Sequence, residues 1–200
     1  ILNDTLSEYD NVKVINRDVL KTDMTSLIEE EFGGERVSIA ANLPYYITTP
    51  IITGVIDAKL PLKNLVVMVQ KEVADRLTAK AGSKDYGAIS VLCQYYTEVS
   101  TVTVVPAHLF VPPPKVHSAV VKMVFRDTPA VTPKDEKMFF KTVKAAFSQR
   151  RKTLLNCLAS NFPKSKDELV EIMESVGIDP RRRGETLTLE EFQKLSDMLG

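Results

Sequence analysis

Residues 36–45 read Arg-Val-Ser-Ile-Ala-Ala-Asn-Leu-Pro-Tyr. The first six predict a strand that ends abruptly at Asn42, because proline cannot continue a sheet ladder. Residues 65–69 form a continuous apolar run, which is typical of a strand covered on both faces. Open α/β sheets bind their ligands beyond the carboxyl ends of such strands. The polar side chains that follow Ala41 are therefore the first candidates for chemistry.

Short apolar runs alternate with helix-like segments through the first 126 residues. Further strands are predicted at residues 12–15, 99–105 and 119–125, and helices at about 49–58, 71–79 and 87–96. Strands that alternate with helices in this way favour a mainly parallel α/β sheet.

The pattern changes in the last third of the chain. Residues 132–135, Thr-Pro-Lys-Asp, have the pattern of a helix start with proline at the first helical position. Two capping boxes follow, at residues 165–168 and 188–191, and each opens an amphipathic helix. We therefore predict two domains, an α/β domain over residues 1–128 and a small all-helical domain over residues 129–200.

The composition excludes several classes of protein. The 200 residues are 44% hydrophobic and 26% charged, which suffices for a buried core and excludes a disordered chain. Cys93 and Cys157 lack a CxxC spacing, which excludes a disulfide framework and a cysteine zinc site. Neither His108 nor His117 has an acidic or cysteine partner at ligand spacing, so we expect no metal. Without a signal peptide or an apolar run of roughly 18 residues, we expect a cytoplasmic protein with no membrane segment.

The net charge is zero, but the basic residues are unevenly distributed. Residues 101–200 hold 16 Lys and Arg against 12 Asp and Glu, and residues 137–166 hold eight basic residues and no acidic one. Such a segment is compatible with a polyanionic partner, because local potential steers association more than net charge does. A solvated helix face would give the same pattern.

The four residues Asn42-Leu-Pro-Tyr45 suit chemistry on the exocyclic amine of a base. Such an amine is a poor nucleophile because its lone pair is delocalised into the ring. The Asn42 side-chain oxygen and the Leu43 carbonyl can accept its hydrogens and free the lone pair, while Pro44 fixes the turn. Tyr45 offers a face for stacking an unstacked base. A strand-ending turn with a core tyrosine would have the same four residues.

Two longer motifs resemble signatures of the ribosomal RNA adenine N6-dimethyltransferases. Residues 42–52, Asn-Leu-Pro-Tyr-Tyr-Ile-Thr-Thr-Pro-Ile-Ile, are similar to the amine-binding motif of that family. Residues 110–121, Phe-Val-Pro-Pro-Pro-Lys-Val-His-Ser-Ala-Val-Val, resemble its second signature, F-x-P-x-P-K-V-x-S-A-V. The similarity extends over essentially the whole chain, and it is greatest to the bacterial members that act on the small ribosomal subunit.

The resemblance implies a role for each matching residue. Asn42, Leu43 and Pro44 would hold the target amine, and Tyr45 and Phe110 would sandwich the flipped adenine. The implied cofactor is S-adenosylmethionine, with Asp18 on its adenine amine and Asn42 near its methionine part. A helix-capping role for Asp18 and a core position for Phe110 are the alternatives.

The helical domain would bind ribosomal RNA through basic contacts to phosphates. Its candidate residues, together with one from the second signature, are Lys115, Lys141, Lys144, Arg150, Arg151, Lys152, Arg181 and Arg182. The arginines near residue 182 could instead tie the final helices together, and Lys115 could form a structural salt bridge.

The sequence departs from the family at its beginning. Members start with a strand, a glycine-rich loop, a helix and a second acid for the cofactor ribose, and none of these is present here. The chain also begins with Ile1. We therefore expect a Rossmann-like class I methyltransferase domain that lacks its N-terminal third, with weak or absent S-adenosylmethionine binding and no activity of its own.

The resemblance implies dimethylation of the N6 amines of adjacent adenines near the 3′ end of small-subunit (16S) rRNA. The implied partner is the 30S subunit or its precursor, the implied role is subunit maturation, and the expected state is a monomer. Two alternatives remain, an Erm-type methyltransferase of large-subunit RNA and a ribosome-assembly factor without catalysis. The intact residues 42–45 and Phe110 argue against the latter, because a pure binder does not need an amine clamp.

Overall fold

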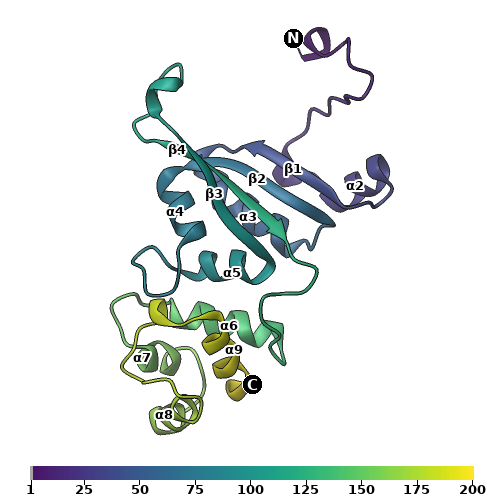
Figure 1. Ribbon diagram of the computed structural model, residues 1–200. Helices are drawn as coiled ribbons and strands as arrows, with labels where there is room; N and C mark the ends of the chain where they lie inside the picture. The colour runs from purple at the N-terminus through teal and green to yellow at the C-terminus, as the bar shows by residue number, and fades with distance from the viewer. Residues whose placement is uncertain (1) are drawn as a thin grey trace.

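The fold is built around a four-stranded sheet in the computed structural model, which describes residues 2–200. The strands are β1 (Val37–Asn42), β2 (Leu62–Gln70), β3 (Thr97–Val105) and β4 (Ser118–Phe125), in the spatial order β1-β2-β4-β3 (Figure 1). β1 and β2 are parallel, whereas β4 is antiparallel to both of its neighbours. The α/β class is as predicted, but the expectation of a mainly parallel sheet is wrong. β3 and β4 are joined by a loop instead of a crossover helix, and such a connection makes neighbouring strands antiparallel.

Two further expectations about strands are also wrong. Residues 12–15 belong to no strand in the described chain, and Val12, Val14 and Ile15 are exposed. An apolar run forms a strand only where another strand pairs with its backbone, and here the segment before α2 extends away from the sheet (Figure 1). In β2, Leu65, Val67 and Val69 are buried while the residues between them are only partly covered, so this strand is not enclosed on both faces.

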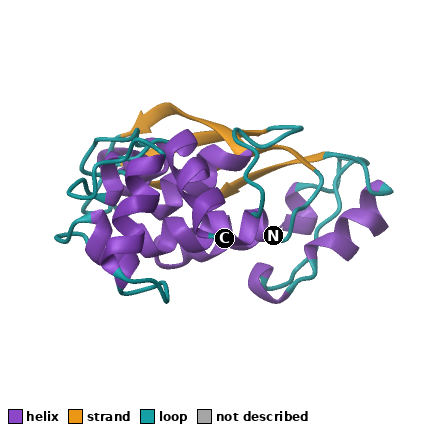
Figure 2. Cartoon of the chain, turned by 90° about the horizontal axis from the view of Figure 1, so that it is seen from below, coloured by secondary structure: helices purple, strands orange, loops and turns teal. Residues whose placement is uncertain are grey.

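The helices of the sheet region gather on one side of the sheet (Figure 2). They are α2 (Met24–Phe32), α3 (Thr48–Asp57), α4 (Lys71–Thr78) and α5 (Ala88–Tyr96). The short helix α1 (Leu2–Thr5) lies apart from them, at the end of the extended N-terminal segment (Figure 1). Three short 3-10 turns complete the region: η1 (Val19–Lys21), η2 (Tyr45–Ile47) and η3 (Ala107–Leu109). Apolar side chains of α3, α4 and α5 pack against those of β2 and β4 to form one core. This one-sided layer leaves the carboxyl end of β1 accessible.

The C-terminal region is helical, as predicted. It contains α6 (Glu136–Ala146), α7 (Leu154–Ala159), α8 (Lys166–Ser175), η4 (Gly184–Thr186) and α9 (Leu189–Leu199). The capping boxes at Ser165 and Thr188 are present, with each hydroxyl accepting a hydrogen bond from the N–H three residues later. The start predicted at residues 132–135 is misplaced, because the Asp135 carboxylate caps the helix and the first helical residue is Glu136.

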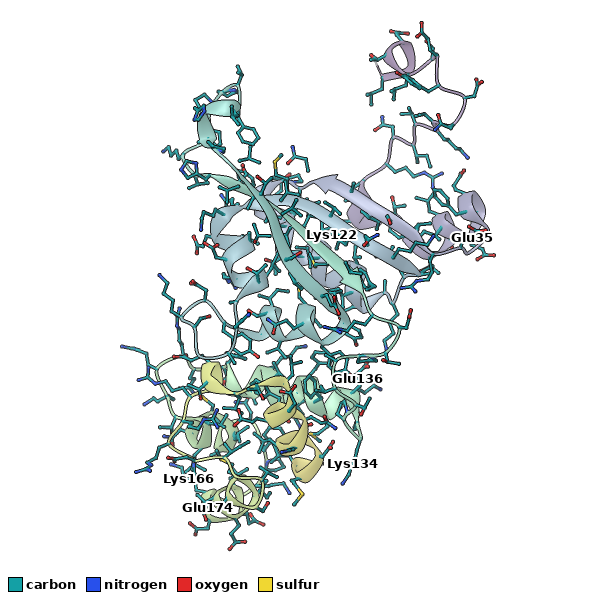
Figure 3. The ribbon with its side chains drawn as sticks, in the orientation of Figure 1. Glu35, Lys122, Lys134, Glu136, Lys166 and Glu174 are labelled. Atoms are coloured by element: carbon teal, nitrogen blue, oxygen red, sulfur yellow. The ribbon has the colours of Figure 1, made fainter. Side chains whose placement is uncertain are left out.

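The junction between the two regions is formed by α5. Tyr95 belongs to the core of the helical region, and Tyr96 packs against both cores. The Glu136 carboxylate accepts hydrogen bonds from Tyr95 Oη and Lys59 Nζ where the helices meet the sheet region (Figure 3). Burial raises the pKa of the Glu136 carboxyl, but the bonds from Lys59 and the tyrosines outweigh burial and hold it below its ordinary value. Because α5 serves both cores, the boundary near residue 128 stays a prediction.

Candidate adenine-binding site

The turn after β1 is held in place by backbone and side-chain hydrogen bonds. Leu43 N donates to Met68 O of β2 at 3.2 Å, and the Leu43 side chain is buried. The Pro44 carbonyl accepts from Ile47 N and from the buried Thr48 hydroxyl, each at 3.1 Å. Proline at this point ends the ladder and fixes the backbone φ, so that the chain enters η2 in one conformation. The abrupt end of the strand predicted at Asn42 is confirmed.

The two sequence motifs meet at a cavity of about 350 Å³. Its lining residues come from the turn after β1 and from the loop between β3 and β4: Asn42, Leu43, Pro44, Tyr45, Phe110, Val111, Pro112 and Pro114. All five residues predicted to hold the adenine thus face one space, although they lie far apart in the sequence. A hollow bounded by two partly buried aromatic rings and a carbonyl-bearing turn suits a planar base.

The hydrogen-bonding groups of the turn are available to a ligand. The bonds of the described chain leave the exposed Asn42 side chain and the Leu43 carbonyl oxygen without a protein partner. Tyr45 is anchored instead, since its hydroxyl lies 2.7 Å from Ser118 Oγ. The site therefore combines one anchored ring, that of Tyr45, with acceptors that have no protein partner.

The loop that carries Phe110 is pinned at its base. Ala107 N donates to His117 Nδ1 at 3.1 Å, and the His117 carbonyl accepts from Lys71 N at 2.9 Å. The roles of Ser118 and His117 could not be read from the sequence, although both lie inside the second signature. Lys115 is exposed in this loop and does not line the cavity.

The structure separates the two residues predicted to bind S-adenosylmethionine. Asn42 lines the cavity, but Asp18 does not. The Asp18 carboxylate accepts a hydrogen bond from Leu20 N at 3.0 Å and caps η1, as the alternative interpretation held. The second cofactor-binding candidate is thus engaged with its own backbone, so we derive no chemical step through the cofactor.

The basic candidates of the helical region differ in what they contact. Arg181 pairs with Asp179, and Arg182 forms a two-pronged pair with Glu191 at 2.5 and 2.9 Å. The bond from Arg182 lowers the pKa of the Glu191 carboxyl, with burial opposing it. Arg182 thus ties the segment before η4 to α9, which is the structural role considered above.

The remaining basic candidates are less constrained. Arg150 donates to the Lys84 carbonyl at 2.6 Å, and Lys141 Nζ lies 4.7 Å from the Phe162 ring centroid. The side chains of Lys144, Arg151 and Lys152 are exposed and have no ion pair or hydrogen bond within residues 2–200. Lys144 and Arg150 also line a cavity of about 920 Å³ at the junction of the two regions. A basic surface next to this junction is compatible with the expected RNA contact.

No helix within the described residues is long and apolar enough to cross a membrane.

Two solved structures share the fold. A dimethyladenosine transferase from Plasmodium falciparum superposes with a TM-score of 0.77 at 24% identity, covering 96% of this chain and 73% of that chain. The 23S rRNA methyltransferase ErmE gives a TM-score of 0.72 at 21% identity, covering 99% of this chain and 76% of that chain.

Curated relatives are more similar in sequence. The ribosomal RNA small subunit methyltransferase A of Bacillus cytotoxicus is 53% identical over 203 residues, and that of Bacillus mycoides is 54% identical over the same length. Each alignment covers 100% of this chain and 70% of the relative. The family described as Ribosomal RNA adenine dimethylase matches residues 1–199. The chain therefore belongs to the ribosomal RNA adenine dimethylase family.

Proposed function

We propose that this chain supplies the adenine-binding and RNA-binding parts of an enzyme that dimethylates the N6 amines of adjacent adenines near the 3′ end of small-subunit rRNA. The cavity shared by the two motifs carries the proposal, because residues 42–43 and the side chains of Tyr45 and Phe110 line it together. The partner is the small subunit or its precursor in the cytoplasm, and the step belongs to subunit maturation.

The residues of the cavity act on the amine and on the base ring. Asn42 Oδ1 and the Leu43 carbonyl accept the two amine hydrogens, which draws the nitrogen toward tetrahedral geometry and makes its lone pair available. Tyr45 and Phe110 stack on the two faces of the adenine, and such stacking contributes roughly 1–3 kcal/mol per base. The lining residues include no carboxylate or imidazole, so the amine proton passes to water.

S-adenosylmethionine is the methyl donor of this activity. Residues 1–200 contain no glycine-rich cofactor loop, and the Asp18 carboxylate is bonded to Leu20 N, so we propose that this chain binds S-adenosylmethionine weakly or not at all. Calorimetric titration of the chain with S-adenosylmethionine measures this directly. Micromolar affinity would contradict the proposal, whereas an absent or millimolar signal supports it.

The activity itself is testable in a chimera. In this chimera the chain replaces the 203 aligned residues of the Bacillus cytotoxicus relative. The purified chimera is incubated with under-methylated 30S subunits and radiolabelled S-adenosylmethionine, and the label is mapped by nuclease digestion. We expect dimethyladenosine in small-subunit RNA, with the unmodified relative as positive control.

Two other results of this experiment would overturn the proposal. Label confined to free large-subunit RNA would assign the chain to an Erm-type activity. Tight binding to the 30S subunit without label, while the unmodified relative labels normally, would identify an assembly factor that has kept the motifs without the chemistry.

A further inference from the structure

Ser118 is a polar residue in an apolar, fully covered position. It is the first residue of β4, its exposed fraction is 0%, and it pairs with Gln70 on one side and Val105 on the other. A buried hydroxyl without a hydrogen-bond partner is destabilising, so such groups are almost always paired. The partner of this hydroxyl is Tyr45 Oη, at 2.7 Å.

This hydrogen bond joins the two halves of the adenine site. Tyr45 comes from the turn after β1, whereas Ser118 begins the strand that follows the Phe110 loop. Among the side-chain pairs of the described chain, it is the one hydrogen bond between residues 42–52 and residues 106–121. It therefore fixes the position of one stacking ring relative to the loop that carries the other.

The neighbouring tyrosine shows what the anchor does. Tyr46 has the same side chain one position further along η2, makes no side-chain hydrogen bond within residues 2–200 and is 85% exposed. Tyr45 is partly buried and tethered at its far end. A phenol held at both Cβ and Oη cannot rotate away from the cavity, because its hydroxyl would lose a partner that is itself buried.

We propose that Ser118 is a positioning residue for base stacking, acting through Tyr45 Oη and without contact to the adenine. This inference rests on the proposed function, because it assumes that Tyr45 stacks on the target base. Its effect falls on the geometry of the bound adenine and hence on methyl transfer. We assign binding of the 30S subunit to the basic helical surface, which consists of Lys141, Lys144, Arg150, Arg151 and Lys152, so this binding is left intact.

A double-mutant cycle in the chimera tests this role. The variants are Ser118→Ala, Tyr45→Phe and the two combined, with kcat and the KM for 30S subunits measured for each. We expect each single variant to lower kcat by about threefold to tenfold, the range for one lost hydrogen bond, with KM unchanged within about twofold. The combined variant should lose no more than either single variant, because all three lack the same bond.

Two controls separate positioning from general damage. Tyr45→Phe removes the bond without changing the buried strand, so it remains informative if Ser118→Ala unfolds. Ser196→Ala removes an equally buried hydroxyl, which donates to Gln193 O at 2.8 Å in α9, and should leave kcat unchanged. Thermal unfolding of every variant monitors the fold.

The inference is overturned if Ser118→Ala and Tyr45→Phe transfer methyl groups at the unmodified rate, or if their losses multiply in the combined variant. Multiplied losses would mean that the two hydroxyls have separate roles. If the chimera itself fails to label small-subunit RNA, the proposed function fails and the role of Ser118 fails with it. The two kinds of failure are distinguishable, because failure of the proposed function is seen in the chimera that carries neither Ser118→Ala nor Tyr45→Phe.

Discussion

The adenine cavity and the helical region each combine anchored side chains with free ones, but the anchored side chains serve different ends. In the cavity, Tyr45 is held by Ser118 while the Asn42 side chain remains without a protein partner. In the helical region, Arg181 and Arg182 are bonded to acidic side chains of their own chain. A run of basic residues in the sequence therefore overstates the surface that can bind phosphate, because part of its charge already holds the fold together.

The largest effect is expected in the cavity. Tyr45→Ala in the chimera should lower methyl transfer by about 10- to 100-fold, because it removes one stacking face worth roughly 1–3 kcal/mol. The affinity for 30S subunits, measured by filter binding, should stay within about twofold. If binding and transfer fall together, Tyr45 is a docking residue and the contrast between the two regions is lost.

An intermediate effect is expected on the helical surface. The double variant Arg151→Ala with Lys152→Ala should weaken 30S binding by about tenfold and reduce the slope of log affinity against log salt by about one to two. The matched control is Lys63→Ala with Lys122→Ala, which removes the same charge from exposed positions of β2 and β4. Equal losses in both variants would show that total charge matters more than location.

A smaller effect, on stability, is expected at Glu191. Glu191→Gln weakens its pair with Arg182 and should lower the free energy of unfolding by about 1 kcal/mol at pH 7. The folded-state pKa of this carboxyl lies below its ordinary value. Its contribution to stability is therefore complete at pH values above the ordinary pKa and is lost as the pH falls through the folded-state pKa. Urea unfolding of the 200-residue chain and of its Glu191→Gln variant at pH 7 and near pH 3 measures this contribution. An equal difference in the free energy of unfolding between the two proteins at both pH values would contradict the ion-pair account.

The part of the site that could be predicted is the part encoded locally. Asn42 and Tyr45 could be placed because a proline directly after an apolar run signals the end of a strand, and Phe110 could be placed because its proline-rich signature is distinctive. Ser118 could not, since its role depends on a hydrogen bond to a residue 73 positions away. The fate of residues 12–15 was equally hidden, because an apolar run does not reveal whether a strand lies beside it.

The fold likewise has features that the local sequence predicts and features that depend on distant residues. The capping boxes at Ser165 and Thr188 are short-range patterns, and both are present. The direction of β4 is a long-range property, fixed by how the chain returns after residue 105, and local periodicity contains no information about it. Local sequence thus predicts helix caps, whereas pairing with distant segments decides the direction of a strand and whether an apolar run such as residues 12–15 forms a strand at all.

The base of the β3–β4 loop closes on the pair Val105 and Ser118. Every residue of the loop, Phe110 included, lies beyond this last rung of the ladder, so its length and composition can change without altering the sheet register. The acceptors that we propose for the amine lie on the other wall, in a turn whose backbone is bonded directly to β2 through Leu43 N and Met68 O. An RNA modification enzyme built this way can vary the loop around Phe110 and so change the nucleotide context that it meets, provided that Phe110 itself is kept against the adenine cavity.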